Sequence, residues 1–384
     1  MIDKNVQNVI PNVDSKKKEE RNVPDLRFSN NVKWYKIKLG EILKIKSGMD
    51  QKKVECENGI YNIYGTGGII GKTNIPLYSK KSVGIGRKGT IDKPFYFDEP
   101  FWTVDTLFYS EIKSHSPKFL YYLFQTINWK YYNQSTGVPS LTSSVIENIA
   151  VYVPNSDDEE IKIADFLDLV EKRITTQKKI ISNLKSLINS IKNTEFYYIK
   201  GFKEKLENIL IELNEKTIIN NQYDVLSSTV KGIFKQSDYF DRTVASENTI
   251  GYKIVKRGNI VVSPQNLWMG NISYNDKFDM GIVSPSYKIF NISSNYNERY
   301  IFEMLTTKKS LYLFKTVSEQ GASVVRRNLN YEAFMQLTFN VPSLNEQNNF
   351  IEKLSLLQSK LSLENKILSL LEQQKQYLLD KLFI

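Results

Sequence analysis

Two glycine-rich segments come closest to the spacing that phosphate chemistry requires. Thr66–Thr73 reads TGGIIGKT and resembles a P-loop, in which a glycine-rich turn binds phosphate at the start of a helix. The P-loop needs glycine where Thr66 stands, and Pro76 interrupts any helix that would follow. Gly84–Gly89 matches the dinucleotide fingerprint G-x-G-x-x-G in letters, but a turn and a strand are expected after it. Neither segment predicts a nucleotide site.

The other reactive side chains are too few or too scattered for acid–base, nucleophilic or metal chemistry. Cys56 is the only cysteine and His115 the only histidine, which excludes a disulfide, a Cys/His zinc site and a Cys–His dyad. A serine triad would need His115, which we expect to be a solvated loop residue. Ser284–Tyr287 resembles part of an amino-methyltransferase motif but lacks its second proline. The acids at 157–160 are explained by a helix N-terminus, which favours negative charge. We expect no catalytic residue, no metal and no cofactor.

Two long amphipathic helices are the elements that would position any site. Each is predicted after a strand that ends in Val-Pro, at Pro154 and at Pro342. Apolar residues then recur in alternating steps of four and three, which is a heptad seam. The second seam repeats the first at a constant offset, and both are interrupted by a polar residue at the same place, Gln177 and Glu364. The seam residues are Ile163, Leu167, Val170, Ile174, Ile181, Leu184, Leu354, Leu357, Leu361, Leu368 and Leu371.

The two halves of the chain also start alike, because Leu39, Ile42 and Leu43 recur with the same spacing as Leu206, Ile209 and Leu210. The offset between these starts is smaller than the offset between the helices, so the extra residues belong to the second half. Between each start and each helix the sequence predicts turns, strands and one short helix, at 118–129 and at 298–314. The expected strands are 61–65, 82–86, 94–97, 252–255, 259–262 and 287–290.

These elements predict an α+β fold with a pseudo-two-fold internal repeat. Two mixed β/α domains would be separated by two long helices that pair as an antiparallel coiled coil; the alternative is two unrelated buried helices. The predicted boundaries are a flexible arm at 1–20, a domain at 21–155, a helix at 156–199, a domain at 200–342 and a helix at 343–384.

The net charge of +10 suggests an anionic partner, and nucleic acid is the first candidate because neutralised phosphates supply most non-specific affinity. A lysine-rich chain that is merely kept soluble is the alternative. No apolar run approaches the roughly 20 residues of a membrane helix, and the N-terminus is polar. We therefore expect a cytoplasmic protein without a membrane partner.

Several segments of the sequence form a recognisable set: Val23–Phe28, Trp34 and Leu39–Glu41 at the front, and Gly281–Tyr287 in the second half. Through these segments the chain resembles the specificity subunit of type I restriction-modification systems. The start of each long helix is a loose version of the family's Pro-x-x-x-Glu/Gln-x-x-Ile pattern. The likeness covers nearly the whole chain after residue 20, and the twofold arrangement is its most specific part.

The resemblance implies two target-recognition domains, each on one half of a bipartite, asymmetric site in double-stranded DNA, and two spacer helices between them. A seam of about 28 residues would span about 42 Å, close to one turn of B-DNA at about 34 to 36 Å. The family's subunit docks two methyltransferase (M) subunits and, as a further partner, restriction (R) subunits. S-adenosylmethionine and ATP are then expected on those partners, and methylation and cleavage outside this chain.

The candidate DNA contacts lie in loops that are basic, glycine-rich or rich in amides. Arginine, asparagine and glutamine can each make two hydrogen bonds to one base, whereas lysine and backbone N–H groups contact phosphates. Arginine is scarce here relative to lysine, so Arg87 and Arg326 are the strongest candidates; a solvated loop is the alternative for each residue. The candidates are Tyr64, Gly65, Thr66, Gly67, Lys72, Arg87, Lys88, Gln265, Asn266, Trp268, Ser323, Arg326 and Arg327.

Two other functions remain open on the sequence. One is a structural protein that forms homo-oligomers through its coiled coil, with incidental basic charge. The other is a nucleotide-dependent enzyme built on the imperfect P-loop. Salt-sensitive binding to a two-part DNA site distinguishes the specificity subunit from both.

Overall fold

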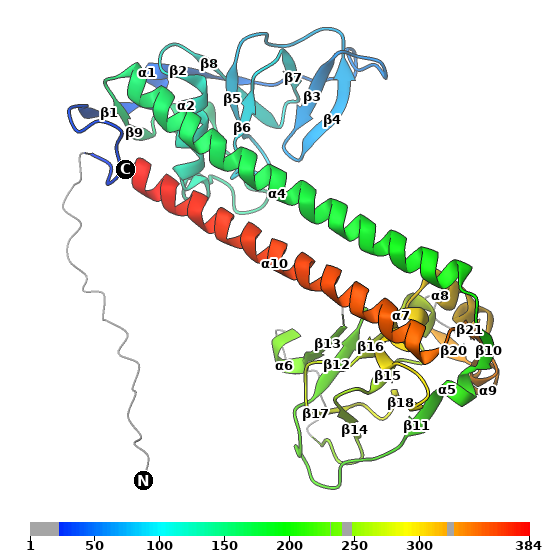
Figure 1. The fold of residues 1–384 in the computed structure, drawn as a ribbon. Coiled ribbons are helices and arrows are strands. Elements are labelled where there is room, and N and C mark those ends of the chain that lie inside the picture. Colours follow the sequence, from blue (N-terminus) through cyan, green and yellow to red (C-terminus); the bar gives the residue numbers. More distant parts are fainter. Residues whose placement is uncertain (1–22, 231, 240–247, 321–325) are drawn as a thin grey trace, which may run out of the picture. The chain divides into compact units, whose positions relative to one another are not determined.

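The computed structural model describes residues 23–230, 232–239, 248–320 and 326–384 (Figure 1). The arm predicted at residues 1–20 lies outside this part of the chain. The chain divides into two compact units: unit 1 contains the residues up to Lys178 together with Ile367–Ile384, and unit 2 is Lys179–Lys366. Each unit has its own sheets and its own hydrophobic core.

Unit 1 is built around a four-stranded antiparallel sheet with the order β2-β8-β5-β6. A second sheet places β3 between β4 and β7, and β1 pairs with β9. The strands are β1 Trp34–Lys38, β2 Leu43–Ser47, β3 Tyr61–Gly65, β4 Gly68–Thr73, β5 Ser82–Gly86, β6 Phe95–Phe97, β7 Phe101–Thr103, β8 Leu107–Ile112 and β9 Ala150–Pro154. The short helices are α1 Leu39–Ile42, α2 Pro117–Thr126, η1 Trp129–Tyr132 and α3 Ser143–Glu147.

Unit 2 repeats this strand order, with β11-β18-β15-β16 as its four-stranded sheet and β10 paired with β21. The strands are β10 Phe202–Lys205, β11 Leu210–Leu213, β12 Leu226–Thr229, β13 Gly232–Lys235, β14 Lys253–Lys256, β15 Ile260–Val262, β16 Ile272–Tyr274, β17 Met280–Val283, β18 Lys288–Ile292, β19 Ser318–Gln320, β20 Arg327–Leu329 and β21 Thr338–Val341. The short helices are α5 Leu206–Ile209, α6 Gln236–Tyr239, η2 Leu267–Met269, α7 Glu298–Leu305, α8 Lys308–Thr316 and α9 Tyr331–Met335. The β19–β20 hairpin adds to the extra length that the sequence places in this half.

One side chain near the start of each long helix explains part of the repeat. Glu160 accepts a hydrogen bond from the backbone N–H of Ser116 at 2.7 Å, and Gln347, at the equivalent position of the second seam, accepts one from Asn297 at 2.8 Å. Ser116 and Asn297 are the N-caps of α2 and α7. The carboxylate and the amide thus fix the same short helix in both units. Glu160 is only 1% exposed, so the acidic run does more than the predicted interaction with the helix dipole.

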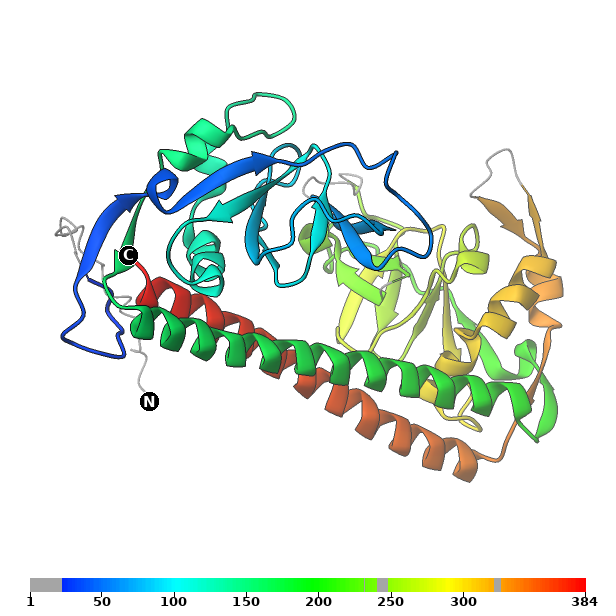
Figure 2. The ribbon, with the colours of Figure 1, turned by 90° about the horizontal axis from the view of Figure 1, so that it is seen from above.

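The two long helices are α4, Asp157–Tyr198, and α10, Leu344–Leu382, and both are unbroken (Figure 2). Within unit 1 they run antiparallel, because Glu171 pairs with Lys375 at 2.5 Å and Lys178 pairs with Glu372 at 2.8 Å. Within unit 2 the ring of Phe196 on α4 packs edge-on against the ring of Phe350 on α10, with 5.6 Å between the ring centroids. All eleven predicted seam residues are buried or half-buried.

The short helices differ from prediction at two places. The helix expected at 298–314 is two helices, because Thr307 caps a new one through its hydroxyl, which accepts a hydrogen bond from Ser310 N at 3.2 Å. The helix expected at 118–129 ends earlier, at Thr126, and the 3₁₀ turn η1 follows. Pro117 begins it directly after the N-cap, as proline at the first helical position favours.

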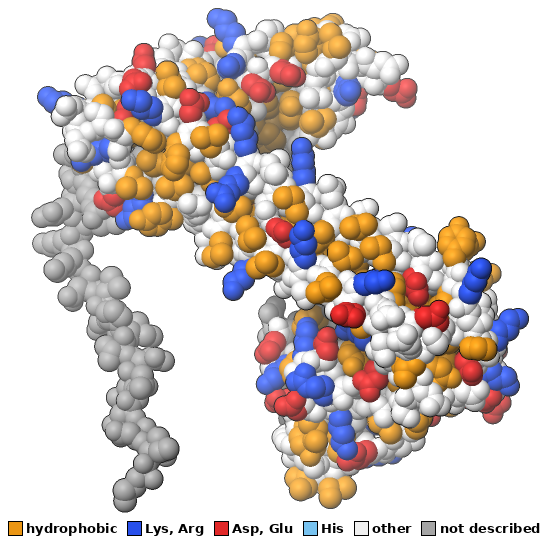
Figure 3. Space-filling view, in the orientation of Figure 1, with side chains coloured by type: hydrophobic (Ala, Val, Ile, Leu, Met, Phe, Trp, Pro, Cys, Tyr) orange, Lys and Arg blue, Asp and Glu red, His pale blue; other side chains and the backbone are white. Residues whose placement is uncertain are grey.

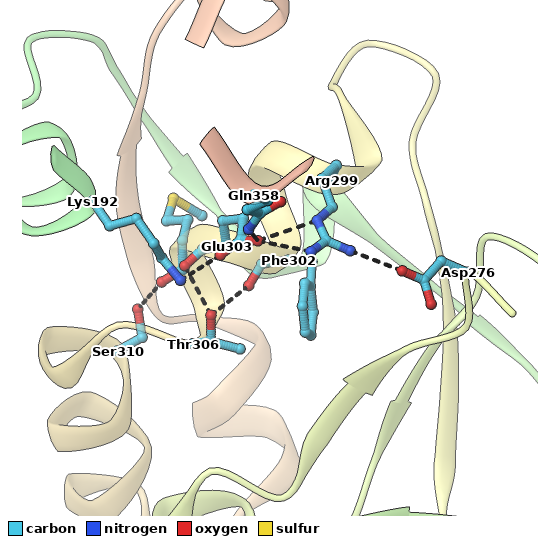
Figure 4. Close-up of polar contacts among 9 residues, drawn as sticks. Lys192, Asp276, Arg299, Phe302, Glu303, Thr306, Ser310 and Gln358 are labelled. Carbon is cyan, nitrogen blue, oxygen red and sulfur yellow. Dashed lines mark hydrogen bonds and ion pairs between the residues drawn. The ribbon is translucent and has the colours of Figure 1, made fainter. Parts of the chain in front are cut away.

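A buried carboxylate joins α7 to both long helices within unit 2 (Figure 4). The side chain of Glu303 is 4% exposed and pairs with Arg299 at 3.0 Å and with Lys192 of α4. The Gln358 amide of α10 donates to the same carboxylate at 3.3 Å. Arg299 also pairs with Asp276 at 3.3 Å, so the network extends to the loop after β16. A charge this deeply buried is stable only because it is paired.

Candidate nucleic-acid interface

Three loops that are distant in sequence converge in unit 1; we call them the Arg87 cluster, defined as Thr66–Gly67, Arg87–Gly89 and Pro139–Leu141. The backbone N–H of Gly89 donates to Pro139 O at 2.9 Å, and Leu141 N–H donates to Arg87 O at 2.9 Å. The β3–β4 turn is adjacent, since a Cβ placed on Gly89 would lie 3.9 Å from Thr66 Oγ1. The sequence predicted the first two loops separately, and the fold places them together.

The cations of this cluster keep donors for a ligand. The backbone N–H of Arg87 is held by Thr106 O at 2.8 Å, which fixes the turn. Its guanidinium makes one long hydrogen bond, 3.4 Å to Asp105 O, and lies 5.9 Å from the Phe108 ring. A guanidinium carries five N–H donors, so most of them are left for another acceptor. Lys88 is exposed beside it.

Three other predicted DNA contacts of the first half lie outside the Arg87 cluster. The Tyr64 ring packs edge-on against Phe97 at 5.0 Å and belongs to a buried aromatic group. Gly65 is buried. Lys72 is exposed, but it lies opposite Asn62 in the register of β3 and β4, at the end of the hairpin away from the turn. These residues shape or flank the hairpin and are not part of the cluster.

A second convergence, the Trp268 cluster, occurs in unit 2 and comprises Gln265–Trp268, Lys315, Arg326 and Arg327. Arg327 N–H donates to Gln265 O at 3.1 Å, which joins the loop after β15 to the β19–β20 hairpin. The guanidinium of Arg327 lies 5.7 Å from the Trp268 ring, and Lys315 lies 5.8 Å from the same ring. No sequence signal pointed to Lys315, because only the fold of α8 brings it to Trp268.

The two arginines of the Trp268 cluster have different surroundings. Arg327 is half-buried and donates to Ser318 O at 2.7 Å, so its side chain is held by its own hairpin. Arg326 is exposed and has no hydrogen-bond or ion-pair partner within the described ranges. Asn266 is half-buried, and its Oδ1 accepts no hydrogen bond from any described residue. Ser323 lies outside the described residues.

The two clusters occupy equivalent places in the repeated topology. Each contains the loop after the third strand of its four-stranded sheet, β5 in unit 1 and β15 in unit 2. In each, that loop's backbone carbonyl accepts from the segment that precedes a short helix: Arg87 O from Leu141 before α3, and Gln265 O from Arg327 before α9. The framework is shared, but the side chains differ. The loop after β5 carries Arg87 and Lys88, whereas the loop after β15 carries the amides of Gln265 and Asn266 and the indole ring of Trp268.

The prediction for His115 is wrong. Its side chain is only 9% exposed and pairs with buried Glu160 through Nδ1, while Nε2 lies 3.4 Å from the Tyr35 hydroxyl. The backbone of His115 is left-handed at φ 70°, a conformation that histidine tolerates better than most residues and that the sequence did not reveal. Nε2 would have to face a serine in a catalytic triad, and here it faces a tyrosine. The residue holds the start of α4 against the loop before α2.

The described residues offer neither a metal centre nor a membrane-spanning helix. No group of three or more histidine, cysteine, aspartate or glutamate side chains among them is placed to hold a metal ion. No helix in the same part of the chain is long and apolar enough to cross a membrane.

Known proteins resemble this chain in sequence motif and in fold. Residues 31–186 match the type I restriction modification DNA specificity domain. The crystal structure of a type I restriction-modification system S subunit from M. genitalium superposes with a TM-score of 0.60 at 16% identity, over 94% of this chain and 99% of that one. A structure from work on complex assembly and conformational transition of the type I R-M system gives 0.57 at 11% identity, over 91% and 97%. At these identities the structures show the fold alone. No curated sequence matches the chain.

Proposed function

We propose that this chain is a specificity subunit of a type I restriction-modification system, which reads a bipartite, asymmetric site in double-stranded DNA and performs no chemistry itself. One observation supports this most: two equivalent loop clusters on a repeated framework carry different side chains. Equivalent placement suits two readers of one duplex, and different side chains suit two different half-sites. In this proposal the Arg87 cluster contacts one half-site and the Trp268 cluster the other.

The long helices are the spacer in this proposal. Helix α4 has 42 residues and α10 has 39, and each runs without interruption from one unit into the other. The buried seam and the ion pairs of unit 1 support an antiparallel coiled coil along their length, related by a pseudo-two-fold axis. Such a pair would hold the two clusters at a set separation, so the gap between half-sites would be fixed by protein geometry.

The outer surface of α10 supports docking of methyltransferase subunits. Leu356, Leu363, Leu370 and Tyr377 recur every seven residues and are 66%, 58%, 55% and 57% exposed. Hydrophobic side chains reach the surface along the helices in the view of Figure 3. A regular, exposed apolar stripe of this kind suits a partner helix. In this proposal two methyltransferase subunits dock there, restriction subunits join them, and these partners hold S-adenosylmethionine and ATP in the cytoplasm.

The stripe gives a direct test of docking. Changing both Leu363 and Leu370 to glutamate should weaken association with the methyltransferase by at least about 3 kcal/mol, because burying each leucine contributes about 1.5 to 3 kcal/mol. Co-purification of the two proteins and a titration calorimetry measurement read this out. Changing both Ser362 and Ser369 to glutamate, which adds the same two charges at exposed positions of α10 outside the stripe, should leave association unchanged. Equal loss in both variants would assign the effect to charge and not to the stripe.

The Arg326 side chain gives a test of base reading. We expect Arg326→Ala to weaken binding to the second half-site by about 1 to 3 kcal/mol if it reads a base. The fold should be unaffected, because the side chain is exposed and has no partner in the described part of the chain. Lys309→Ala removes one exposed positive charge of unit 2 outside the cluster and is the matched control. A loss that is equal on all DNA sequences would make Arg326 a phosphate contact instead.

Mapping methylated adenines in a genome with and without the gene tests the proposal as a whole. We expect a single two-part motif, methylated only when the gene is present, together with salt-sensitive binding of the purified complex to that motif. Methylation that does not change when the gene is removed would reject the proposed function.

A further inference from the structure

Unit 1 has a second basic surface, which the recognition loops do not use. A pocket of about 320 Å³, here the Lys80 pocket, has Tyr78, Lys80, Lys81, Lys113, Ser114 and His115 among its lining residues, beside two apolar ones. Two of these lysines directly precede β5, whereas the Arg87 cluster directly follows it. The intervening five-residue strand separates the two surfaces by roughly 16 Å at about 3.3 Å per residue. The pocket is therefore not part of the proposed base-reading site.

The positive charge of the pocket is largely uncompensated. Lys80 and Lys81 are exposed, and neither has an ion-pair partner among the described residues. Lys113 donates to a backbone carbonyl at 2.6 Å, which orients its ammonium group without neutralising it. Burial raises the pKa of Tyr78, and the nearby Glu111 carboxylate raises it further. Glu111 is itself paired with Lys46 at 3.3 Å, so its charge is already balanced outside the pocket.

The carboxylate nearest the histidine of the pocket is also committed. Glu160 is 1% exposed, pairs with His115 and accepts from the Ser116 backbone N–H at 2.7 Å. These contacts fix the wall of the pocket that His115 forms. A pocket lined by three lysines and a serine hydroxyl offers several donors to one anion.

The repeat shows that the fold does not require a lysine at position 113. The Lys113 backbone N–H donates to Ile42 O at 2.9 Å, and the Ser293 backbone N–H donates to Ile209 O at 2.9 Å. Lys113 and Ser293 are therefore equivalent positions, one cationic and one neutral. The framework bond is the same with either side chain.

Among the described residues, the two that precede the third strand of the sheet also carry unpaired positive charge in unit 1 only. The strand registers of β5 with β8 and of β15 with β18 make Lys80 equivalent to Arg257 and Lys81 equivalent to Gly258. Arg257 is neutralised by Asp279 at 2.9 Å. A Cβ on Gly258 would lie 3.1 Å from a carboxylate oxygen of Glu298. Unit 2 thus places acids where unit 1 has free cations, so the basic pocket is particular to unit 1.

We propose that the Lys80 pocket binds a phosphate group. Three lysines that line one pocket, together with the Ser114 hydroxyl, match the charge and the acceptors of a phosphate better than those of a single carboxylate. The cavity volume suits one phosphate or a short phosphate chain and excludes a duplex from its interior. The phosphate belongs either to a small phosphorylated molecule or to the backbone of DNA passing over the rim. This site is independent of the proposed base reading.

His115 is a direct reporter of binding, because it is the only histidine of the chain and it lines the pocket. The full chain, labelled with ¹³C-histidine, is titrated with inorganic phosphate at constant pH and ionic strength, with chloride as the balancing anion. We expect the single imidazole resonance to shift and saturate. Lys80→Ala/Lys81→Ala should weaken phosphate binding about tenfold or more, since two of the three cations are lost.

Lys52→Ala/Lys53→Ala is the matched control, because it removes another exposed lysine pair of unit 1 outside the pocket. Its titration should equal that of the unaltered chain. A shift that does not saturate, or one that persists unchanged in Lys80→Ala/Lys81→Ala, overturns the proposal.

A competition experiment identifies the source of the phosphate. ATP and a non-specific short DNA duplex are each added to the phosphate-loaded chain. Displacement by ATP alone supports a small phosphorylated ligand, and displacement by the duplex supports the DNA backbone. Failure of both to displace phosphate overturns the site. Lys80→Ala/Lys81→Ala should still discriminate between matched and mismatched DNA sites, so loss of this pocket is distinguishable from failure of the proposed function.

Discussion

Glu303→Ala is expected to lower the free energy of unfolding of unit 2 by about 3 kcal/mol, at the lower end of the range for breaking a buried ion pair. The carboxylate is 4% exposed, and its removal leaves Lys192 and Arg299 facing each other without the anion between them. Both cations are partly exposed, 22% and 31%, and this limits the loss. Calorimetry should show the unit 2 transition moving down by about 6 to 12 °C.

Two variants make this prediction specific. Glu303→Gln keeps the shape of the side chain but removes the charge, so it should lose a large part of the same free energy. Glu332→Ala removes an exposed acid on α9 and should change stability by less than about 0.5 kcal/mol. A loss below about 1 kcal/mol in Glu303→Ala would show that the network is not what fixes α7 to the long helices.

Periodicity made the long helices and the repeat predictable. The seams alternate four and three over many turns, and this pattern is visible without knowing the partner. The structure confirms both helices to within a few residues, α4 at Asp157–Tyr198 and α10 at Leu344–Leu382. The strands at 61–65 and 82–86 were equally clear, because β-branched and aromatic residues there are bounded by glycine turns.

The candidate site was predictable only in pieces. The sequence suggests that Arg87 and Arg326 lie in loops, because glycines and polar residues surround them. It does not reveal that Leu141 closes on Arg87 or that Arg327 closes on Gln265, because those backbone bonds join segments that are far apart along the chain. Nothing local encodes such contacts.

The environment of His115 could not be predicted from the sequence either. His115 lies in a polar, turn-like stretch, which is typical of solvated residues. Its burial results from Glu160 on α4, 45 residues away, which reaches into that turn. Local composition predicted the turn correctly and the environment wrongly, because the environment is tertiary.

Gly86→Ala is expected to abolish the contribution of the Arg87 cluster to DNA binding. A Cβ at Gly86 would lie 1.9 Å from the backbone oxygen of Thr90, and a backbone atom cannot move aside without moving the turn. The turn carries Arg87, so we expect about 2 to 3 kcal/mol less binding to the first half-site, comparable to losing a base-reading arginine. Binding is measured by titrating the complex with DNA in which only one half-site is matched.

Gly137→Ala is the matched control for that backbone effect, because a Cβ at Gly137 meets nothing within 4 Å and the residue lies outside the cluster. It should leave the stability of unit 1 unchanged, whereas Gly86→Ala should lower it by about 1 to 3 kcal/mol through overpacking. If both variants lose the same binding energy without a loss of stability, the steric argument for Gly86 fails.

Combining Gly86→Ala with Arg326→Ala tests whether the two clusters act separately. If each unit reads its own half-site, the two losses concern different contacts and should add to within about 0.5 kcal/mol on fully matched DNA. On DNA with only the second half-site matched, Gly86→Ala should then have little effect and Arg326→Ala its full effect. A combined loss well below the sum would mean that both clusters contribute to a single contact, which is incompatible with a bipartite reader.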